Sequence, residues 1–531
     1  MTFAAIALAA IAVLPSDRLA MADRLFNRGE YASARVEYAA LAGDRSIPED
    51  ELLYRLAECD RALNRPDDAR RGYSALLERF PTSAHADRAR LMRALSGKRE
   101  DRAAELRKLD SDRVAPGIRA AALYYLGSDA NDPELLARSI RLDPNGRYAP
   151  YADFHRASLL VKSPDPAVRR KAVEILLSLA FGRESQFSDD ALYLAAVQSY
   201  NEKKYGEAAS IFTRYLKRHP DGKHAADVRT MAAWSNYLNG KCADAAALCG
   251  DGKTDDFAYL LGACAYATGD NASAQRLFKD YLERYPQGKY RANAELPLAR
   301  MGFDAASSGG DGAGVIENAK RAYALSAQPG DALRLAWAYE KCGKEAEAEA
   351  QYAETAKKFP GTDEAAEALF RKAMADARAK KWSACDLALA EALASGKNAK
   401  RRAESLYWRG VAATQLGHEA EGAGFLEEAL EAGLSLDESR EARLMLADAA
   451  FRGGRADEAK AAYAKLVREG ACERMNAAKL LAVGKLLGGD EAKTCAAELG
   501  KCDSAEWRQA GAVLLGATEE KAGNFTQAVA A

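Results

Sequence analysis

One short segment, GDGKT at residues 250–254, has the residue types of a phosphate-binding loop. In such a loop, backbone N–H groups surround the phosphates. The full pattern also requires a glycine five residues before Gly252, which precedes the lysine. That position is Ala247 in this chain, and no strand pattern leads into the segment. The sequence therefore argues against nucleotide binding here.

The other residue types that serve in catalysis or metal binding are dispersed along the chain. The segment HEAEG begins with His418 but lacks the second histidine of a zinc-binding helix. His219 and His224 are typical of turn or surface residues, and the pair Glu427-Glu428 is typical of a solvated helix face. No Ser/His/Asp order and no Cys/His pair stands out. We therefore expect a protein that is not an enzyme, with no catalytic residue, no metal site and no cofactor.

The chain has nine cysteines, and none of them forms a Cys-x-x-Cys motif. Cys242 and Cys249 are seven residues apart, as are Cys495 and Cys502. On one continuous helix this spacing corresponds to a rise of about 10.5 Å, which is too far for a disulfide. A bond would require the helix to end between the two cysteines. The sequence favours small, buried helix residues instead.

The overall composition is typical of a soluble, folded and helical protein. The 531 residues include 76 basic and 77 acidic side chains, so the formal net charge is -1. This balance gives no long-range field that would attract nucleic acid or an anionic membrane, and we expect neither as a partner. Abundant alanine and only 15 prolines favour helix, because alanine loses least on becoming helical and proline breaks the hydrogen-bond ladder.

The elements that would position functional residues show a repeated spacing. In four copies, a small residue is followed after 7 residues by a helix-ending residue and after 5 more by an alanine. An aromatic ring follows 4 residues after the alanine, and a proline follows 8 residues after the ring. The complete copies are Ala57, Asn64, Ala69, Tyr73, Pro81; Ala196, Lys203, Ala208, Phe212, Pro220; Gly262, Gly269, Ala274, Phe278, Pro286; and Ala336, Gly343, Ala348, Tyr352, Pro360. Copies without the proline begin at Ala22, Gly410 and Ala447.

Each position of this frame has a role in a pair of packed helices. The first small residue allows close approach, and Gly or Asn then ends the first helix, because a left-handed backbone costs least for these residues. Lys203 departs from this rule. The alanine lies at the closest crossing of the second helix, and the ring four residues later shares its face. Proline ends the second helix and can begin the next one, which gives units of about 34 residues.

At these residues the chain resembles the tetratricopeptide repeat family. The aromatic-Pro-x-Ser/Gly phrase between units is similar to that of bacterial envelope repeat proteins, namely the outer-membrane assembly lipoproteins and the Tol-Pal-associated periplasmic coordinator. The resemblance implies an all-α fold, a right-handed α-solenoid of stacked helical hairpins, in which neighbouring units bury each other's apolar faces. The chain departs from the lipoprotein members, because its first cysteine is Cys59 and no lipid-anchoring cysteine follows the initial apolar run.

The N-terminal residues are expected to form a separate segment. Residues 2–14 carry no charge and are too few to span a bilayer as a helix. Ala20-Met21-Ala22 is a small-x-small site of the kind that signal peptidases cut, although no basic residue precedes the apolar run. We therefore expect residues 1–22 to be a signal peptide or N-terminal apolar segment. The alternative is a buried first helix of the fold.

The rest of the chain is expected to form three regions of hairpins. These are residues 23–189, whose repeats become degenerate from about residue 84, a regular array at 190–327, and a second array at 328–531 that ends within a repeat. The Gly-rich segment 307–314 is expected to be a long turn inside one hairpin, with a hinge as the alternative. Because solenoids normally have a capping helix at each end, we expect the natural protein to continue past Ala531.

The resemblance also implies a binding surface. In the family, first helices line the concave face, and residues three before, one after and four after the first small residue point into it. Here these positions are rich in Tyr and Trp, the residue types that most often anchor interfaces, although the rings could instead only pack between adjacent units. The candidate protein-binding residues are Tyr54, Tyr193, Tyr200, Trp234, Tyr237, Tyr259, Tyr266, Trp337 and Tyr407.

The sequence thus predicts a non-enzymatic helical-repeat scaffold that binds a protein or peptide in a concave groove. The expected location is exported, periplasmic or outer-membrane associated, in contact with envelope complexes, and the alternative is cytoplasmic. Two other functions remain open. The chain could be a regulatory or substrate-recruiting region of a larger protein whose catalytic or membrane module is absent, or a protein that binds or processes peptidoglycan or another polysaccharide through the same aromatic stripe.

Overall fold

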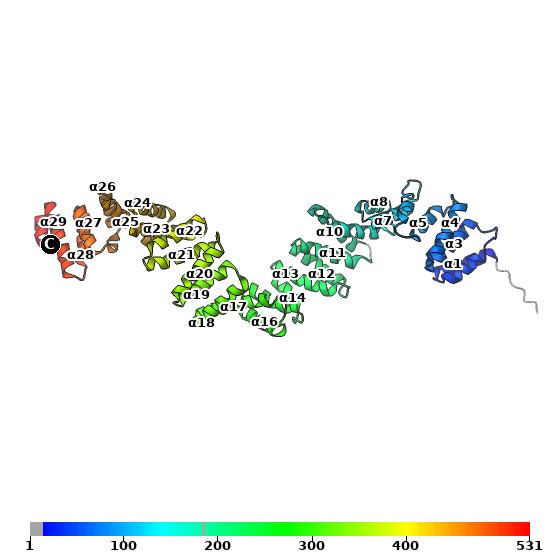
Figure 1. Cartoon of the computed structure of the whole chain (residues 1–531), viewed down its shortest axis with the longest axis horizontal. Helices are drawn as coiled ribbons and strands as arrows, with labels where there is room; N and C mark the ends of the chain where they lie inside the picture. Colours follow the sequence, from blue (N-terminus) through cyan, green and yellow to red (C-terminus); the bar gives the residue numbers. More distant parts are fainter. Residues whose placement is uncertain (1–13, 183–185) are drawn as a thin grey trace, which may run out of the picture. The chain divides into compact units, whose positions relative to one another are not determined.

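The structure is a computed structural model that describes residues 14–182 and 186–531. All regular secondary structure in these residues is helical, with thirty α-helices and two short 3₁₀-helices. The chain divides into two compact units, Met1–Tyr281 and Leu282–Ala531. In each unit, helices that follow one another in the chain pack together as hairpins (Figure 1). The predicted all-α fold of stacked helical hairpins is confirmed.

The helices of the first unit are α1 (Pro15–Asn27), α2 (Tyr31–Ala39), α3 (Glu49–Ala62), α4 (Pro66–Arg79), α5 (Ala86–Leu95), α6 (Arg102–Arg107), α7 (Pro116–Ala130), α8 (Pro133–Leu142), α9 (Ala149–Leu160), α10 (Pro166–Phe181), α11 (Ser188–Asn201), α12 (Tyr205–Arg218), α13 (Ala225–Leu238), α14 (Cys242–Cys249), α15 (Asp255–Ala267) and α16 (Asn271–Arg284). The last residues of α16 extend past the limit of this unit.

The helices of the second unit are α17 (Arg291–Gly309), α18 (Gly312–Ser326), α19 (Pro329–Lys341), α20 (Glu345–Lys358), α21 (Asp363–Arg378), α22 (Trp382–Ala394), α23 (Arg402–Gln415), α24 (Glu419–Ala432), α25 (Leu436–Arg452), α26 (Ala456–Arg468), α27 (Ala477–Leu487), α28 (Gly489–Gly500), α29 (Ala505–Lys521) and α30 (Phe525–Ala530). The 3₁₀-helices are η1 (Ala399–Arg401) and η2 (Ala471–Arg474).

The residue that ends each first helix has the left-handed backbone that the frame requires. The φ angle is 58° at Asn64, 60° at Lys203 and 80° at Gly269. Lys203 therefore departs from the frame in residue type but not in conformation. Because a left-handed backbone is unfavourable for lysine, packing of the two helices against each other must hold this turn in place.

The small residues of the frame lie where two helices approach closely. A Cβ atom added to Gly262 would lie 2.7 Å from Phe278, and one added to Gly410 would lie 2.6 Å from Leu426. On the second helices, Ala69 and Tyr73 share one face and are fully buried. The predicted packing of small residue against ring is confirmed at Gly262, whereas Leu426 takes the place of the ring beside Gly410.

Buried tyrosines of the second helices donate hydrogen bonds to carboxylates of the first helices. The Oη atom of Tyr215 lies 2.5 Å from Asp189, that of Tyr281 lies 2.6 Å from Asp255, and that of Tyr463 lies 2.5 Å from Asp448. A buried hydroxyl without a partner would be destabilising, so each carboxylate makes the ring compatible with the core.

The prolines of the frame lie in the turns between hairpins. Pro81 lies between the end of α4 at Arg79 and the start of α5 at Ala86, so it ends one helix without beginning the next. The turn is closed by hydrogen bonds, since Ser83 N donates to Phe80 O at 3.1 Å and Ser83 Oγ donates to Asp50 at 2.6 Å.

The structure describes the Gly-rich segment 307–314 in full but the N-terminal segment only from residue 14. The Gly-rich segment is part of a hairpin, but the expectation of a long turn is wrong, because α17 continues to Gly309 and only Gly310 and Asp311 separate it from α18. Residues 1–13 lie outside the described residues. Pro15 begins α1, and Ala22 is fully buried in a core that includes Ala34 and Tyr38.

The nine cysteines are all free thiols. Cys242 and Cys249 are the two ends of α14, so they cannot reach each other. Six of the nine are buried, as expected for small residues of helix interfaces: Cys59, Cys249, Cys264, Cys385, Cys472 and Cys495.

Candidate protein-binding surface

The first helices of three consecutive hairpins in the first unit carry six of the candidate rings. α11 holds Tyr193 and Tyr200, α13 holds Trp234 and Tyr237, and α15 holds Tyr259 and Tyr266; α13 and α15 pack directly against each other. Tyr259 is buried, with 9% of its surface exposed. The other five rings are half-buried, so each keeps part of its surface accessible to solvent.

Trp234 is the centre of an aromatic cluster that joins α13 to α15. Its ring stacks on Tyr259, with centroids 6.0 Å apart and planes 26° apart, and it meets Tyr237 edge-on, also at 6.0 Å. The indole Nε1 donates a hydrogen bond to Asp256 at 2.8 Å. Because ring contacts and a hydrogen bond both fix the indole, its exposed edge is presented in one orientation.

Tyr193 and Tyr200 are held by residues of the adjacent turns. Tyr193 stacks on His224 with ring centroids 4.0 Å apart and planes 6° apart, and Nε2 of that histidine lies 2.9 Å from Asp190. Tyr200 meets Tyr205, the first residue of α12, edge-on at 5.5 Å. Tyr193 thus bridges two hairpins, whereas Tyr200 packs within one.

Burial raises the pKa of three tyrosine hydroxyls on this surface. Desolvation raises the pKa of Tyr259 to about 12, and it also raises the pKa of Tyr200 and Tyr237 above their ordinary value. These side chains therefore offer neutral rings and hydroxyl groups, the chemistry of an interface anchor, not of a catalytic base.

The three remaining candidate residues lie elsewhere. Tyr54 in α3 and Tyr407 in α23 are buried, each with 8% exposure, so their rings pack between helices. Trp337 in α19 is half-buried and lines a pocket of about 310 Å³ together with Phe303 and Leu333. The structure joins the rings of α13 and α15 in one cluster, and Tyr193 and Tyr200 lie on the preceding first helix, α11. Tyr54, Trp337 and Tyr407 lie on other helices.

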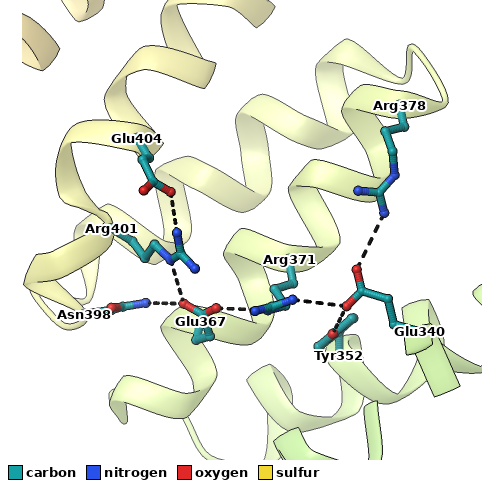
Figure 2. A network of polar contacts seen from close by, with 8 residues as sticks. All are labelled: Glu340, Tyr352, Glu367, Arg371, Arg378, Asn398, Arg401 and Glu404. Carbon is teal, nitrogen blue, oxygen red and sulfur yellow. Dashed lines mark hydrogen bonds and ion pairs between the residues drawn. The ribbon is translucent and has the colours of Figure 1, made fainter. Parts of the chain in front are cut away.

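A charged network of the second unit was not anticipated from the sequence. Figure 2 shows it crossing from α19 through α21 to α23. Arg371 lies between Glu340, at 3.4 Å, and Glu367, at 3.0 Å. Glu367 also accepts from Asn398 at 2.8 Å and Arg401 at 3.3 Å. Tyr352, Arg378 and Glu404 complete the network.

The sequence signal that could have revealed this network is a pair of oppositely charged residues separated by about one repeat length. Glu340 and Arg371 are 31 residues apart, and Glu367 and Arg401 are 34 residues apart. Such pairs lie on equivalent positions of adjacent hairpins, so they hold neighbouring repeats in register. The network uses three arginines and three glutamates, and its charges balance.

Neither a metal-binding cluster nor a membrane-spanning helix is found in the part of the chain that the structure describes. Within residues 14–182 and 186–531, no group of three or more His, Cys, Asp or Glu side chains is arranged to hold a metal ion. In the same residues, no helix combines the length and apolar character that crossing a membrane requires.

Two protein families match parts of the chain. Residues 51–83, 256–288, 332–362 and 441–469 match the tetratricopeptide repeat family. Residues 185–252 match a family described as outer membrane lipoprotein. No curated protein matches the chain in sequence.

Solved structures similar to this chain include three repeat proteins. The Cut9–Hcn1 hetero-tetramer of the APC/C is 13% identical over 86% of this chain and 96% of that chain, with a TM-score of 0.27. Yeast Tom70 is 14% identical over 86% and 91%, with a TM-score of 0.25. The TPR domain of P58(IPK) is 13% identical over 76% and 98%, with a TM-score of 0.26. The chain thus contains four tetratricopeptide repeats, and each of them folds as a helical hairpin.

Proposed function

We propose that this chain is a non-enzymatic scaffold that binds a protein or peptide on the surface formed by its first helices. The observation that carries the proposal is the partial exposure of Tyr193, Tyr200, Trp234, Tyr237 and Tyr266. Rings that fill the core of this fold, such as Tyr73 and Phe212, are completely buried. The partly exposed rings thus keep surface that the packing of the helices does not cover. Tyr and Trp rings lose little conformational entropy when a partner fixes them.

We further propose that the chain acts in a bacterial cell envelope. The match of residues 185–252 to a family described as outer membrane lipoprotein supports this location, as does the apolar character of residues 2–14. Because Ala22 is part of the first hairpin core, cleavage would have to occur before Pro15 to leave α1 intact.

Mass spectrometry of the natural protein tests the location. We expect the mature chain to begin near Pro15 and to be recovered from the envelope fraction, because this cleavage removes the apolar segment and keeps Ala22 in place. An intact Met1 on a cytoplasmic protein would contradict export. A chain that begins after Ala22 would instead contradict the assignment of α1 to the fold.

Site-specific photo-crosslinking tests the binding surface. A photoreactive phenylalanine analogue placed at position 200, 237 or 266 should give a discrete crosslinked product with envelope extract. The matched controls are the exposed second-helix positions Lys217 and Lys279, where the same analogue should give none. Equal crosslinking at both sets of positions would reject the first-helix surface.

A further inference from the structure

Two buried thiols of the second unit lie in contact with each other. Cys472 belongs to η2, the short 3₁₀-helix after α26, and Cys495 lies in α28, against which η2 packs. The two side chains share a hydrogen bond, and both belong to one apolar core, with exposures of 3% and 0%. Because α28 is the second helix of the hairpin α27/α28, this contact joins that hairpin to the preceding one, α25/α26.

The packing around Cys495 holds its thiol in place. At Gly484 in α27, an added Cβ atom would lie 3.1 Å from the Cβ atom of Cys495. The two helices of this hairpin therefore approach closely beside the thiol. Leu499, one turn later in α28, is completely buried in the same core. A movement that changes the distance between the two thiols must therefore come mainly from η2.

η2 is an element that can supply this movement. It has four residues, and it lies between Gly470, with φ of 76°, and Met475. Its last turn is closed by the hydrogen bond from Met475 N to Cys472 O, at 3.0 Å. A short 3₁₀ segment has poorer hydrogen-bond geometry than an α-helix, and such segments open at a lower cost in free energy than the helices of a core. Adjustment of η2 can therefore bring the two sulfur atoms from hydrogen-bond contact to bonding distance.

The hydrogen bond makes the two thiols chemically unequal. The bond from Cys495 lowers the pKa of Cys472, whereas the same bond, together with burial, raises the pKa of Cys495. The thiolate is the nucleophile in thiol–disulfide exchange. Cys472 is therefore the thiol that reacts first, and Cys495 is the one that completes the exchange.

We propose that Cys472 and Cys495 form an intramolecular disulfide that fastens the hairpin α27/α28 to the hairpin α25/α26. The oxidant is a small-molecule disulfide such as oxidised glutathione. The Cys472 thiolate attacks one glutathione sulfur, and the other glutathione leaves as a thiolate. Cys495 then loses its proton and attacks the sulfur of Cys472, which releases the second glutathione. The two glutathione thiolates take up the two cysteine protons, so one protein disulfide forms as one glutathione disulfide is reduced.

The bond should stabilise this part of the chain. The two cysteines are 23 residues apart in the sequence. A cross-link over this distance restricts the unfolded chain, so oxidation should raise the melting temperature by several degrees. The proposal rests on neither the first-helix surface nor the envelope location, although an envelope compartment would supply oxidising conditions. A test with purified protein therefore separates its failure from theirs.

Refolding in a glutathione buffer, followed by disulfide mapping, tests the proposal. The reduced, unfolded full chain is refolded with both reduced and oxidised glutathione, free thiols are alkylated, and peptides are identified by mass spectrometry. We expect a peptide pair that is linked through Cys472 and Cys495 and that separates on reduction. Cys385, a buried cysteine of α22, should be recovered as a free thiol. Recovery of Cys472 and Cys495 as free thiols, as mixed disulfides with glutathione, or linked to another cysteine would overturn the proposal.

Matched variants connect the bond to stability. Cys502 is half-buried and lies seven residues after Cys495, so it is the nearest alternative partner in the sequence. Cys502→Ala should keep both the linkage and the rise in melting temperature on oxidation, and Cys472→Ala should lose both. An equal rise in Cys472→Ala would show that this bond is not the cause of the stabilisation. If Cys472→Ala does not fold, disulfide mapping of the unmodified chain still decides.

Discussion

At the scale of single residues, one position of the repeat frame has a backbone conformation that its residue type disfavours. Lys203 has φ of 60°, a conformation that costs non-glycine residues about 1–2 kcal/mol. We expect Lys203→Gly to raise the stability of the chain by up to about 1 kcal/mol, because the glycine's greater freedom in the unfolded state offsets part of the gain. Chemical denaturation of both proteins measures the difference.

The reciprocal substitution is the control for Lys203. Gly269 occupies the equivalent position of a later hairpin, with φ of 80° and no atom near its missing side chain. Gly269→Lys should therefore destabilise by a similar amount through backbone strain alone. If both substitutions change stability in the same direction, the backbone explanation is wrong.

A second residue, Glu202, makes the folding stability of the chain depend on pH. Its carboxylate lies 2.7 Å from Lys204 and 2.7 Å from Arg169, which joins α10 to the end of α11. Hydrogen bonds from these two cations lower the pKa of Glu202 to about 2. The folded-state pKa is below the unfolded one, so the contribution is present at neutral pH and is lost as the pH falls from about 4.3 to about 2.

Glu202→Gln should accordingly lower the melting temperature at pH 7, and the difference from the unmodified chain should vanish near pH 2. Thermal unfolding at several pH values measures this. Glu174→Gln, at an exposed position in the middle of α10, serves as the matched control and should have no effect at any pH. A difference for Glu202→Gln that stays constant across the pH range would show that the pairing with cations is not its cause.

The candidate ring residues show how far the sequence predicts the role of a side chain. The frame placed Tyr54, Tyr259 and Tyr407 on first helices, but it could not tell that these three are buried while Tyr200 and Tyr266 are half-buried. Exposure depends on how far the next hairpin extends over each ring, and that depends on long-range packing. Spacing within a repeat does not contain this information.

At the scale of helices, close approach within a hairpin depends on small residues at defined positions. Gly410 in α23 faces α24, and an added Cβ atom would lie 2.6 Å from Leu426 and 3.1 Å from the carbonyl oxygen of Gly422. We expect Gly410→Ala to destabilise the chain by about 1–3 kcal/mol, because backbone and side chain must both move to accept the methyl group.

Gly424 provides the matched control on the same hairpin. It also lies within a helix, but an added Cβ atom would meet nothing within 4 Å. Gly424→Ala should stabilise by about 0.5–1 kcal/mol, because alanine is the better helix former. Denaturant unfolding of both variants should thus give shifts of opposite sign. Stabilisation by both substitutions would contradict close packing at Gly410.

Contacts between adjacent hairpins, and those within one hairpin, were predictable in part. Pairs such as Arg169 and Glu202, 33 residues apart, and Arg300 and Asp331, 31 residues apart, follow the repeat length, so their spacing is visible in the sequence. The hydrogen bonds of Tyr215 and Tyr281 to first-helix carboxylates were not anticipated. Each buried ring could have met one of several nearby acidic residues, and only the packed helices select the partner.

At the scale of the whole molecule, the sequence predicted the fold well because the same local frame recurs. Each copy specifies a helix end, a close crossing and a ring, and adjacent copies then pack in the same way. Function is less determined, because a repeat scaffold can present many kinds of surface. The central claim is therefore that the half-buried rings of the first helices bind a partner, and do not merely close the space between hairpins.

The most direct test measures affinity and melting temperature on the same variants, with the partner identified by crosslinking. The account predicts that Tyr200→Ala and Tyr266→Ala weaken binding by about thirtyfold, or about 2 kcal/mol, with little change in melting temperature. Tyr259→Ala, at the buried ring, should instead lower the melting temperature. Unchanged affinity per folded molecule in Tyr200→Ala and Tyr266→Ala would contradict the claim.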